Sequence, residues 1–267
     1  MVFIPPAPEA PCFTAYLIAD LSDDQLNEFK AAFQLGACSR FSPLMELKIV
    51  RPPADYVGQS HQYMRQKENE AGCKQPFVVI DQEFLKRGAV WYIEQFAQEE
   101  EVEEGEAEST DVVWKILIKT EALALSWVNY DIANMNVGED LANSGVDLPL
   151  KNNFEQPDVW DCGGMDMEEQ QWHQNVWVTA EPGEYEETTD RKLRKDFMPR
   201  PKKLARLKDD IAQAAGLVNH WTIIGDAEDF ELPDGTTKTF PEGSVVLQLR
   251  YNPEFPRSNA KWPQGSL

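Results

Sequence analysis

Apolar residues in the first third of the chain fall into three short runs that are separated by mixed polar stretches. The run Phe77–Asp81 contains four apolar residues, three of them β-branched, and it ends on an aspartate. A run without polar alternation is typical of a strand that is buried on both faces of a sheet. Similar runs occupy residues 15–20 and 46–50, and the stretches near 22–36 and 58–70 have helical spacing. This pattern predicts a β-α-β-α-β core.

After this core the pattern changes from helical crossovers to antiparallel strands. Residues 89–96 and 111–119 have the composition of strands, and the acidic run 99–111 between them favours a solvated loop. A helix is expected at about 121–135, where Thr120 supplies an N-cap. We therefore expect an α/β fold, in which a mixed sheet begins β-α-β-α-β and is extended by antiparallel strands.

The second half of the chain has shorter and more irregular apolar runs. Strands are expected at residues 172–180, 220–224 and 244–251, and Pro233–Thr236 is typical of a hairpin turn. Residues 202–215 have the spacing of an amphipathic helix. The pattern predicts a C-terminal α+β region, which either forms a small lobe of its own or adds strands to the first sheet.

The domain organisation follows from these patterns. The Pro-rich residues 1–12 are expected to form an extended arm, residues 13–154 an α/β domain, and residues 155–267 the C-terminal α+β extension. The first residues lack the basic and apolar regions of a signal peptide. Because no apolar run reaches the length of about 18 residues that crosses a bilayer, we expect no membrane span.

The acidic composition disfavours some partners and indicates a location. The chain of 267 residues has a formal net charge of −21 at pH 7, which disfavours nucleic acid because phosphate binding requires clustered cations. Eight tryptophans indicate a packed core rather than a disordered chain. The four cysteines form no C-x-x-C motif, so we expect free thiols in a reducing, cytoplasmic compartment.

Two motifs give the chain a resemblance to a known group of domains. Ala19–Asp24 forms an acidic turn after the first predicted strand, and Asn129–Asn136 reads N-Y-D-I-A-N-M-N. The acidic stretch Val137–Leu141 continues the second motif. In these features the chain resembles a family of small, mostly bacterial domains of unknown function, over about residues 13–154. Since that family has no established activity, the resemblance implies an α/β architecture and supplies no catalytic residues.

Carboxylates follow the predicted strands of the core. Asp20 and Asp81 each come directly after a strand, Asp24 lies just beyond the first of them, and Lys119 ends a later strand. Because ligands of such sheets bind at the carboxyl ends of the strands, Asp20, Asp81 and Lys119 are candidate catalytic residues. Asp20, Asp24 and Asp81 are candidate ligands of Mg²⁺, a hard ion that prefers carboxylates. Helix capping and charge neutralisation, which need no ligand, are the alternative interpretation of the same residues.

A second possible chemistry is a cysteine nucleophile. Cys162 lies in a Gly-rich turn, His173 follows eleven residues later, and His220 lies further along the chain. A cysteine nucleophile requires a thiolate that is activated by a nearby base. No recognised motif surrounds Cys162, so the sequence does not place these groups together.

A basic segment reverses the charge of the chain locally. Between Arg191 and Lys208 the sequence contains nine Lys or Arg residues. Such a segment either forms a partner surface or is a solvated face, and the acidic run 99–111 is a candidate internal counterpart. The candidate partner-binding residues are Arg191, Arg194, Lys195, Lys202, Lys203 and Arg206.

Two functions of different classes remain open. The absence of catalytic motifs, together with the segregated charges, favours an intracellular binding or scaffold protein that engages a protein partner or a second copy of itself. The alternative is an enzyme that uses the acidic strand-end cleft, for example in Mg²⁺-dependent phosphoryl transfer or hydrolysis. The sequence does not decide whether the chain is an enzyme.

Overall fold

A computed structural model describes residues 2–6, 9–37, 44–172, 175–252 and 262–267. Within these ranges the chain separates into two compact units. The larger unit extends from Ala10 to Met167 and includes residues 262–267 at the end of the chain, whereas the smaller unit contains the first residues and those from Glu168 to Asn252. The division at Met167 lies later than residue 154, where the sequence analysis placed it. Each unit is described by itself.

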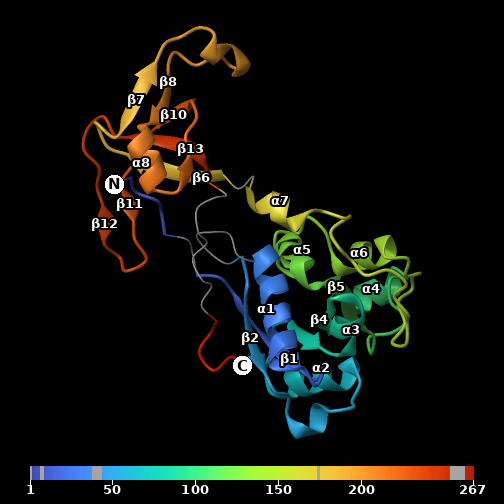
Figure 1. Cartoon of the computed structure of the whole chain (residues 1–267). Coiled ribbons are helices and arrows are strands. Elements are labelled where there is room, and N and C mark those ends of the chain that lie inside the picture. Colours follow the sequence, from blue (N-terminus) through green and yellow to red (C-terminus); the bar gives the residue numbers. More distant parts are fainter. Residues whose placement is uncertain (1, 7–8, 38–43, 173–174, 253–261) are drawn as a thin grey trace. The chain divides into compact units, whose positions relative to one another are not determined.

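The larger unit contains a five-stranded mixed sheet. Its strands, in chain order, are β1 (Cys12–Leu17), β2 (Glu46–Val50), β3 (Phe77–Ile80), β4 (Ala89–Phe96) and β5 (Val113–Lys119). The spatial order is β2-β1-β3-β4-β5, with parallel pairing among the first three strands and antiparallel pairing at β3–β4 and β4–β5. The predicted α/β fold, with a β-α-β-α-β start and an antiparallel extension, is confirmed (Figure 1).

Helices fill the connections of the larger unit. In chain order they are α1 (Asp23–Ala37), η1 (Ala54–Tyr56), α2 (His61–Glu70), α3 (Gln82–Arg87), α4 (Glu99–Glu103), η2 (Thr120–Ala122), α5 (Leu123–Asp131) and α6 (Val137–Asn143). The helix α7 (Met167–Trp172) begins at Met167, where the two units divide. The acidic run after β4, predicted as a loop, therefore begins with a helix. The reason is its Glu101 side chain, which accepts hydrogen bonds from the Gln98 backbone N–H over 2.6 Å and the Trp114 indole over 2.9 Å.

β3 explains why the two crossover helices cover opposite faces of the sheet. Its Val78 and Ile80 belong to the same buried cluster as Phe29 of α1. Its Phe77 and Val79 belong to a second cluster, which contains Met64 of α2. Successive strand residues point to opposite faces, so a strand in which all four residues are buried requires a cover on both sides.

The outer edge of β2 is covered by the last residues of the chain. The Leu267 backbone N–H donates to the Ile49 carbonyl over 2.9 Å, and the Ile49 N–H donates to Ser266 Oγ over 3.0 Å. Trp262 packs beside Phe33 of α1, with 5.9 Å between the ring centres. An uncovered edge strand is a template for pairing with other chains, so these contacts protect the sheet from edge-to-edge association.

The smaller unit is built on an antiparallel sheet of its own. Its strands are β6 (Asn175–Ala180), β7 (Tyr185–Thr188), β8 (Leu204–Leu207), β9 (Leu217–Val218), β10 (Thr222–Asp226), β11 (Phe230–Glu231), β12 (Thr237–Lys238) and β13 (Val245–Tyr251), with the helices η3 (Leu193–Asp196) and α8 (Asp209–Ala214). The order is β6-β13-β10-β8-β7, β9 pairs with β13, and β11 pairs with β12. Phe3 of the N-terminal arm pairs with Thr179 of β6.

The predicted helix over residues 202–215 is wrong in its first part. Residues Leu204–Leu207 form β8, which pairs with β7 and β10, and the helix α8 begins at Asp209. Ala205 and Leu207 are buried on the core face, so the alternation of a strand fits these residues as well as helical spacing does. Long-range pairing decided between the two. Among the described residues, no helix combines the length and apolar character needed to cross a membrane.

Candidate functional site

Three predicted site residues lie at the same end of the strands of the larger sheet. β1, β3 and β5 run in the same direction, so Asp20, Asp81 and Lys119 lie at the carboxyl ends of strands on this edge. The first two strand ends are neighbours, because the Ile18 backbone N–H donates to the Ile80 carbonyl over 2.9 Å. The fold therefore places the carboxyl ends of all three strands on the same side of the sheet.

Two of these side chains are engaged by the local fold. Asp81 caps α3 through its Oδ1, which accepts the Glu83 backbone N–H over 2.8 Å, and burial raises the pKa of its carboxyl. Lys119 Nζ donates to the Arg87 carbonyl over 2.7 Å at the end of the same helix. Both residues thus stabilise α3, one at each end.

The structure does not gather the predicted magnesium ligands into one group. Asp20 is exposed, Asp24 lies in the first turn of α1, and Asp81 is the cap of α3. In the part of the chain that the structure describes, no three His, Cys, Asp or Glu side chains are arranged to hold a metal ion. The first turn of α1 favours the charge of Asp24, and Asp81 serves as the cap of α3, so neither residue requires a metal ion. The magnesium site stays a prediction.

Cys162 is held as a protonated thiol. Its Sγ lies 3.3 Å from Ser126 Oγ and 3.8 Å from the Ala122 carbonyl, which the thiol can reach as a donor. Burial raises the pKa of the thiol, which disfavours the thiolate that a nucleophile requires. His173 lies outside the described residues, and His220 belongs to the smaller unit. The contacts of Cys162 therefore support a structural role.

A buried carboxylate that the sequence analysis missed lies on α6. Asp140 is 1% exposed, and its Oδ2 accepts a hydrogen bond from the Tyr130 hydroxyl over 2.7 Å. Its Oδ1 has no hydrogen-bond partner among the described residues. Burial raises the pKa of this carboxyl to about 6, the Tyr130 hydrogen bond opposes the rise, and the charge of Glu139 adds to it. Asp140 therefore titrates near neutral pH.

The position of Asp140 follows from local signals in the sequence. The Asn136 side chain accepts the Glu139 N–H over 2.8 Å, and Glu139 accepts the Asn136 N–H over 2.9 Å, which starts α6 with a capping box. From that start, helical spacing puts Val137, Asp140 and Leu141 on one buried face. An aspartate on the apolar face of a capped helix is thus the signal that would have identified this site.

Glu94 is a second carboxyl group of the larger unit whose surroundings disfavour the charged form. Burial, together with the nearby charge of Glu101, raises the pKa of its carboxyl to about 7. It lies on β4 two residues after Tyr92, whose ring centre is 5.7 Å from that of Tyr130. Carboxyls with raised pKa values occur at functional sites and in structural networks alike. Here they make the stability of the larger unit sensitive to pH.

The basic segment forms the end of the β7–β8 hairpin in the smaller unit. We call residues 189–203 the basic loop; Figure 1 shows that it extends beyond the strands of its sheet. Its shape is fixed by Arg194, whose Nη1 donates to the Pro201 carbonyl over 2.9 Å and the Lys202 carbonyl over 2.7 Å. The same side chain donates through Nε to the Asp190 carbonyl over 3.4 Å. These three hydrogen bonds therefore hold the two sides of the basic loop together.

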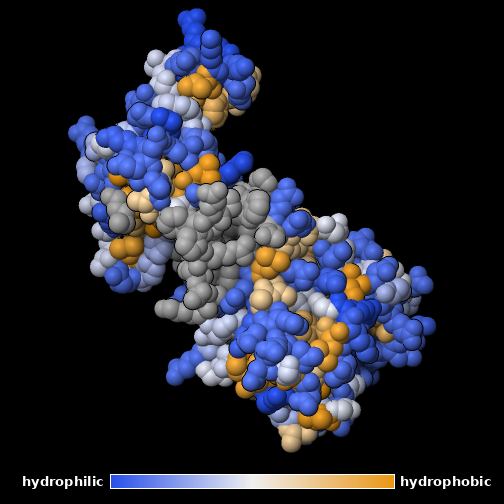
Figure 2. Space-filling model, in the orientation of Figure 1, coloured by the Kyte–Doolittle hydropathy of each residue, from blue (hydrophilic) through white to orange (hydrophobic). Residues whose placement is uncertain are grey.

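Five further cations of the basic loop face solvent. Among the described residues, no carboxylate lies within ion-pair distance of the exposed side chains Arg191, Lys192, Lys195, Arg200 and Lys202. Met198 is 88% exposed beside them. Figure 2 shows this end of the hairpin as hydrophilic surface around a hydrophobic patch. Unpaired cations around an apolar side chain are the features of a surface that binds an anionic partner.

The six predicted partner-binding residues thus divide into three groups. Arg191, Lys195 and Lys202 are exposed in the basic loop, and Arg194 holds the loop together. The last two are paired with acids of β7. Lys203, the final residue of the basic loop, pairs with Glu187 over 2.6 Å, and Arg206 of β8 pairs with Glu186. Composition identified the segment, but it could not separate paired from unpaired cations, because the pairing depends on strand register.

Comparisons with known proteins add no assignment. No family model, curated protein or solved structure matches the chain. The resemblance to a family of unknown function therefore stays a prediction.

Proposed function

We propose that the chain is a binding protein that holds an acidic segment of a partner protein against the basic loop. The observation that carries this proposal is the group of five exposed cations without carboxylate partners among the described residues. The loop contains seven Lys or Arg residues and two Asp residues, in a chain whose net charge is −21. In so acidic a chain, the absence of internal neutralisation at this place is best explained by an external acid.

The build of the loop supports a preformed contact surface. Arg194 ties both sides of the loop together, so less conformational entropy is lost when a partner orders the surrounding lysines. Met198 supplies an apolar contact at the centre of the charged surface, as a partner with an acidic and partly apolar segment would require. A nucleic acid is the other kind of polyanion that carries such charges, and the test below separates it from an acidic protein segment.

The test is a fluorescence-anisotropy titration with fluorescein-labelled poly-L-glutamate as the acidic probe. A variant with Lys192→Ala and Lys195→Ala removes two unpaired cations of the loop. Its control, Lys74→Ala with Lys208→Ala, removes two exposed lysines elsewhere. We expect the loop variant to bind the probe about fivefold or more weakly, and the control to change affinity less than about twofold.

Two results would contradict the proposal. The first is an equal loss in both double variants, because it would mean that only the overall charge of the chain matters. The second is tighter binding of a labelled single-stranded DNA than of poly-L-glutamate at about 150 mM salt. That outcome would assign the basic loop to nucleic acid instead.

A further inference from the structure

The most acidic stretch of the chain lies on α4 and just after it. We call residues 99–108 the Glu-rich segment; it contains seven glutamates and no Lys or Arg, and no other ten-residue stretch carries as many acids. Five of its glutamates are exposed, namely Glu99, Glu100, Glu103, Glu104 and Glu108. Among the described residues, no ion pair neutralises any of these five. Like charges held so close repel one another, so an external cation would be favourable here.

The Glu-rich segment has a fixed shape. At its start, Glu101 accepts the Trp114 indole N–H over 2.9 Å, which anchors α4 to β5. At its end, the Glu108 backbone N–H donates to the Leu150 carbonyl over 3.0 Å, and the Leu150 N–H donates to the Glu106 carbonyl over 2.8 Å. A surface that is held at both ends loses little conformational entropy when a partner binds it.

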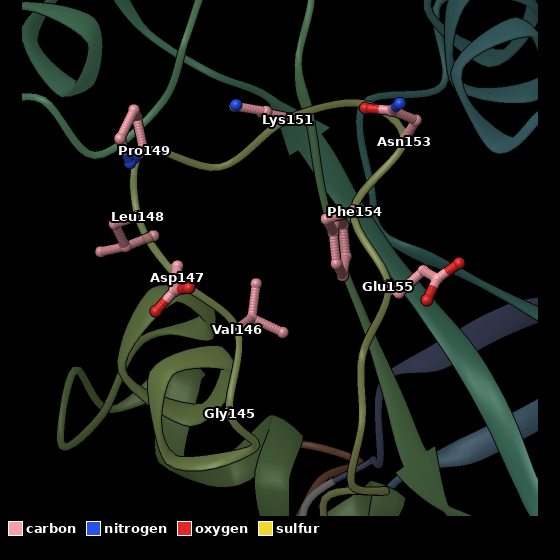
Figure 3. Close-up of a pocket in the computed structure, with 9 residues that line it drawn as sticks. All are labelled: Gly145, Val146, Asp147, Leu148, Pro149, Lys151, Asn153, Phe154 and Glu155. Carbon is pink, nitrogen blue, oxygen red and sulfur yellow. The ribbon is translucent and has the colours of Figure 1, made fainter.

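The chain that braces the Glu-rich segment brings one cation near it. Lys151 follows Leu150, and Figure 3 shows its side chain along the rim of a cavity of about 320 Å³ that residues 145–155 line. No ion pair joins Lys151 to an acid in the part of the chain that the structure describes. Within the described residues of the larger unit, the Glu-rich segment therefore keeps its charge.

The basic loop of the smaller unit has the matching properties with the opposite sign. It contains seven Lys or Arg residues, as the Glu-rich segment contains seven glutamates. Each surface has five exposed charges without an ion-pair partner among the described residues, and each is held in shape by hydrogen bonds. Surfaces of opposite charge steer two molecules toward each other and fix how they meet. The chain therefore carries both halves of one electrostatic contact.

We propose that the acidic partner of the basic loop is the Glu-rich segment of a second copy of this chain. The inference rests on the proposed function, because it names the protein that supplies the acidic segment. Each copy offers one loop and one Glu-rich segment, so the contact joins two different surfaces and extends from dimers to longer assemblies. Salt weakens the contact, since the charges on both sides are exposed and are screened by ions.

The test is sedimentation velocity of the intact chain between about 5 and 200 μM at about 50 mM salt. We expect the mean mass of the wild type to rise by at least about 1.5-fold over this range, and the rise to disappear at about 300 mM salt. A loop variant, Lys192→Glu with Lys195→Glu, should remain monomeric because its loop no longer attracts glutamates. A segment variant, Glu100→Lys with Glu104→Lys, should remain monomeric for the converse reason.

A mixture of the two variants is the decisive sample. The segment variant still has the native loop and the loop variant still has the native Glu-rich segment, so an equal mixture should associate again. The control is Lys74→Glu with Lys208→Glu, which changes two exposed lysines elsewhere and has the same net charge as the loop variant. We expect this control to associate as the wild type does.

Failure of this inference can be told apart from failure of the proposed function. If the wild type binds poly-L-glutamate through the basic loop but stays monomeric up to about 200 μM, the second copy is not the partner and the proposed function stands. Variants that do not associate when mixed, or a segment variant that associates alone, also overturn the inference. If the loop does not bind poly-L-glutamate, both proposals fall.

Discussion

Two arginines make the same kind of contact in different surroundings. Arg65 of α2, in the larger unit, donates to the backbone carbonyls of Gln75, Glu94 and Cys73. Arg194, in the basic loop of the smaller unit, also donates to three backbone carbonyls. Arg65 is 0% exposed, whereas Arg194 is partly exposed. The two arginines therefore bond to equal numbers of carbonyls, and they differ in their access to water.

The difference shows how each unit uses its charged groups. The Arg65 side chain is removed from water, and its guanidinium links the chain after α2 to β4. In the helix predicted at 58–70, Met64 and Arg65 are fully buried. Arg194 instead shapes an exposed loop in which five other cations have no carboxylate partner among the described residues. Arg65 of the larger unit thus makes its hydrogen bonds in the interior, whereas the cations of the basic loop in the smaller unit lie on the surface.

The largest predicted effect belongs to Arg65. Arg65→Met keeps an unbranched side chain against Phe77, but it leaves three carbonyls without their buried donor. We expect the free energy of unfolding to fall by about 3–5 kcal/mol, as measured by urea denaturation. A loss below about 1 kcal/mol would mean that these carbonyls find water, and the contrast with Arg194 would then disappear.

The second effect is a pH dependence of the larger unit. Burial raises the pKa of Asp140 from 3.8 to about 6, so the folded chain binds this proton more tightly than the unfolded chain does. The contribution to the free energy of unfolding therefore falls as pH rises from about 4 to about 6, by about 3 kcal/mol in total. Urea denaturation across this range should show a flatter profile for Asp140→Asn than for the wild type.

The control for this pH dependence is Glu94→Gln. Because burial raises the pKa of Glu94 to about 7, its contribution continues to fall up to about neutral pH, above the window of Asp140. The two variants should flatten different parts of the profile. Identical profiles for Asp140→Asn and the wild type would show that the Asp140 carboxyl is not held in a water-poor site.

The sequence predicted the larger sheet because its signal is local. Phe77–Asp81 has no polar position, and such a run requires cover on both faces wherever it lies. Residues 202–215 offered no such signal: Leu204 and Leu207 fit helical spacing, Ala205 and Leu207 fit strand alternation, and pairing with β7 decided the outcome. The local pattern of apolar residues therefore predicted β3, which is buried on both faces, and it failed for Leu204–Leu207.

The candidate sites differ in the same way. The cations of the basic loop were visible in composition, since exposed charges need no partner to be noticed. The surroundings of Lys115 in β5 were not visible in this way, because they come from Trp91 on the neighbouring strand and Phe154 on a segment 39 residues later in sequence. That segment is held by Gln156, which bonds across a separation of 39 residues to Leu117. Such contacts are set by register, which the pattern of apolar positions does not encode.

The smallest predicted effect concerns the shape of the basic loop. Arg194→Lys retains the positive charge but loses the planar fork that reaches several carbonyls at once. Because these carbonyls are accessible to water, we expect a stability loss below about 1 kcal/mol. Affinity for poly-L-glutamate, measured by anisotropy, should nevertheless fall about threefold, since the loop is less preorganised. Unchanged affinity would mean that charge alone, without a fixed shape, accounts for binding.

The most direct measurement of the central claim is a methyl NMR titration of the chain with poly-L-glutamate after ¹³C-methyl labelling of its methionines. Met198 is 88% exposed in the basic loop, and Met165 is 40% exposed in the larger unit, so the two methyl groups report on different surfaces. If the basic loop holds acidic segments, the Met198 signal shifts in proportion to bound probe while the Met165 signal stays in place. A shift at Met165 with none at Met198 would contradict the account.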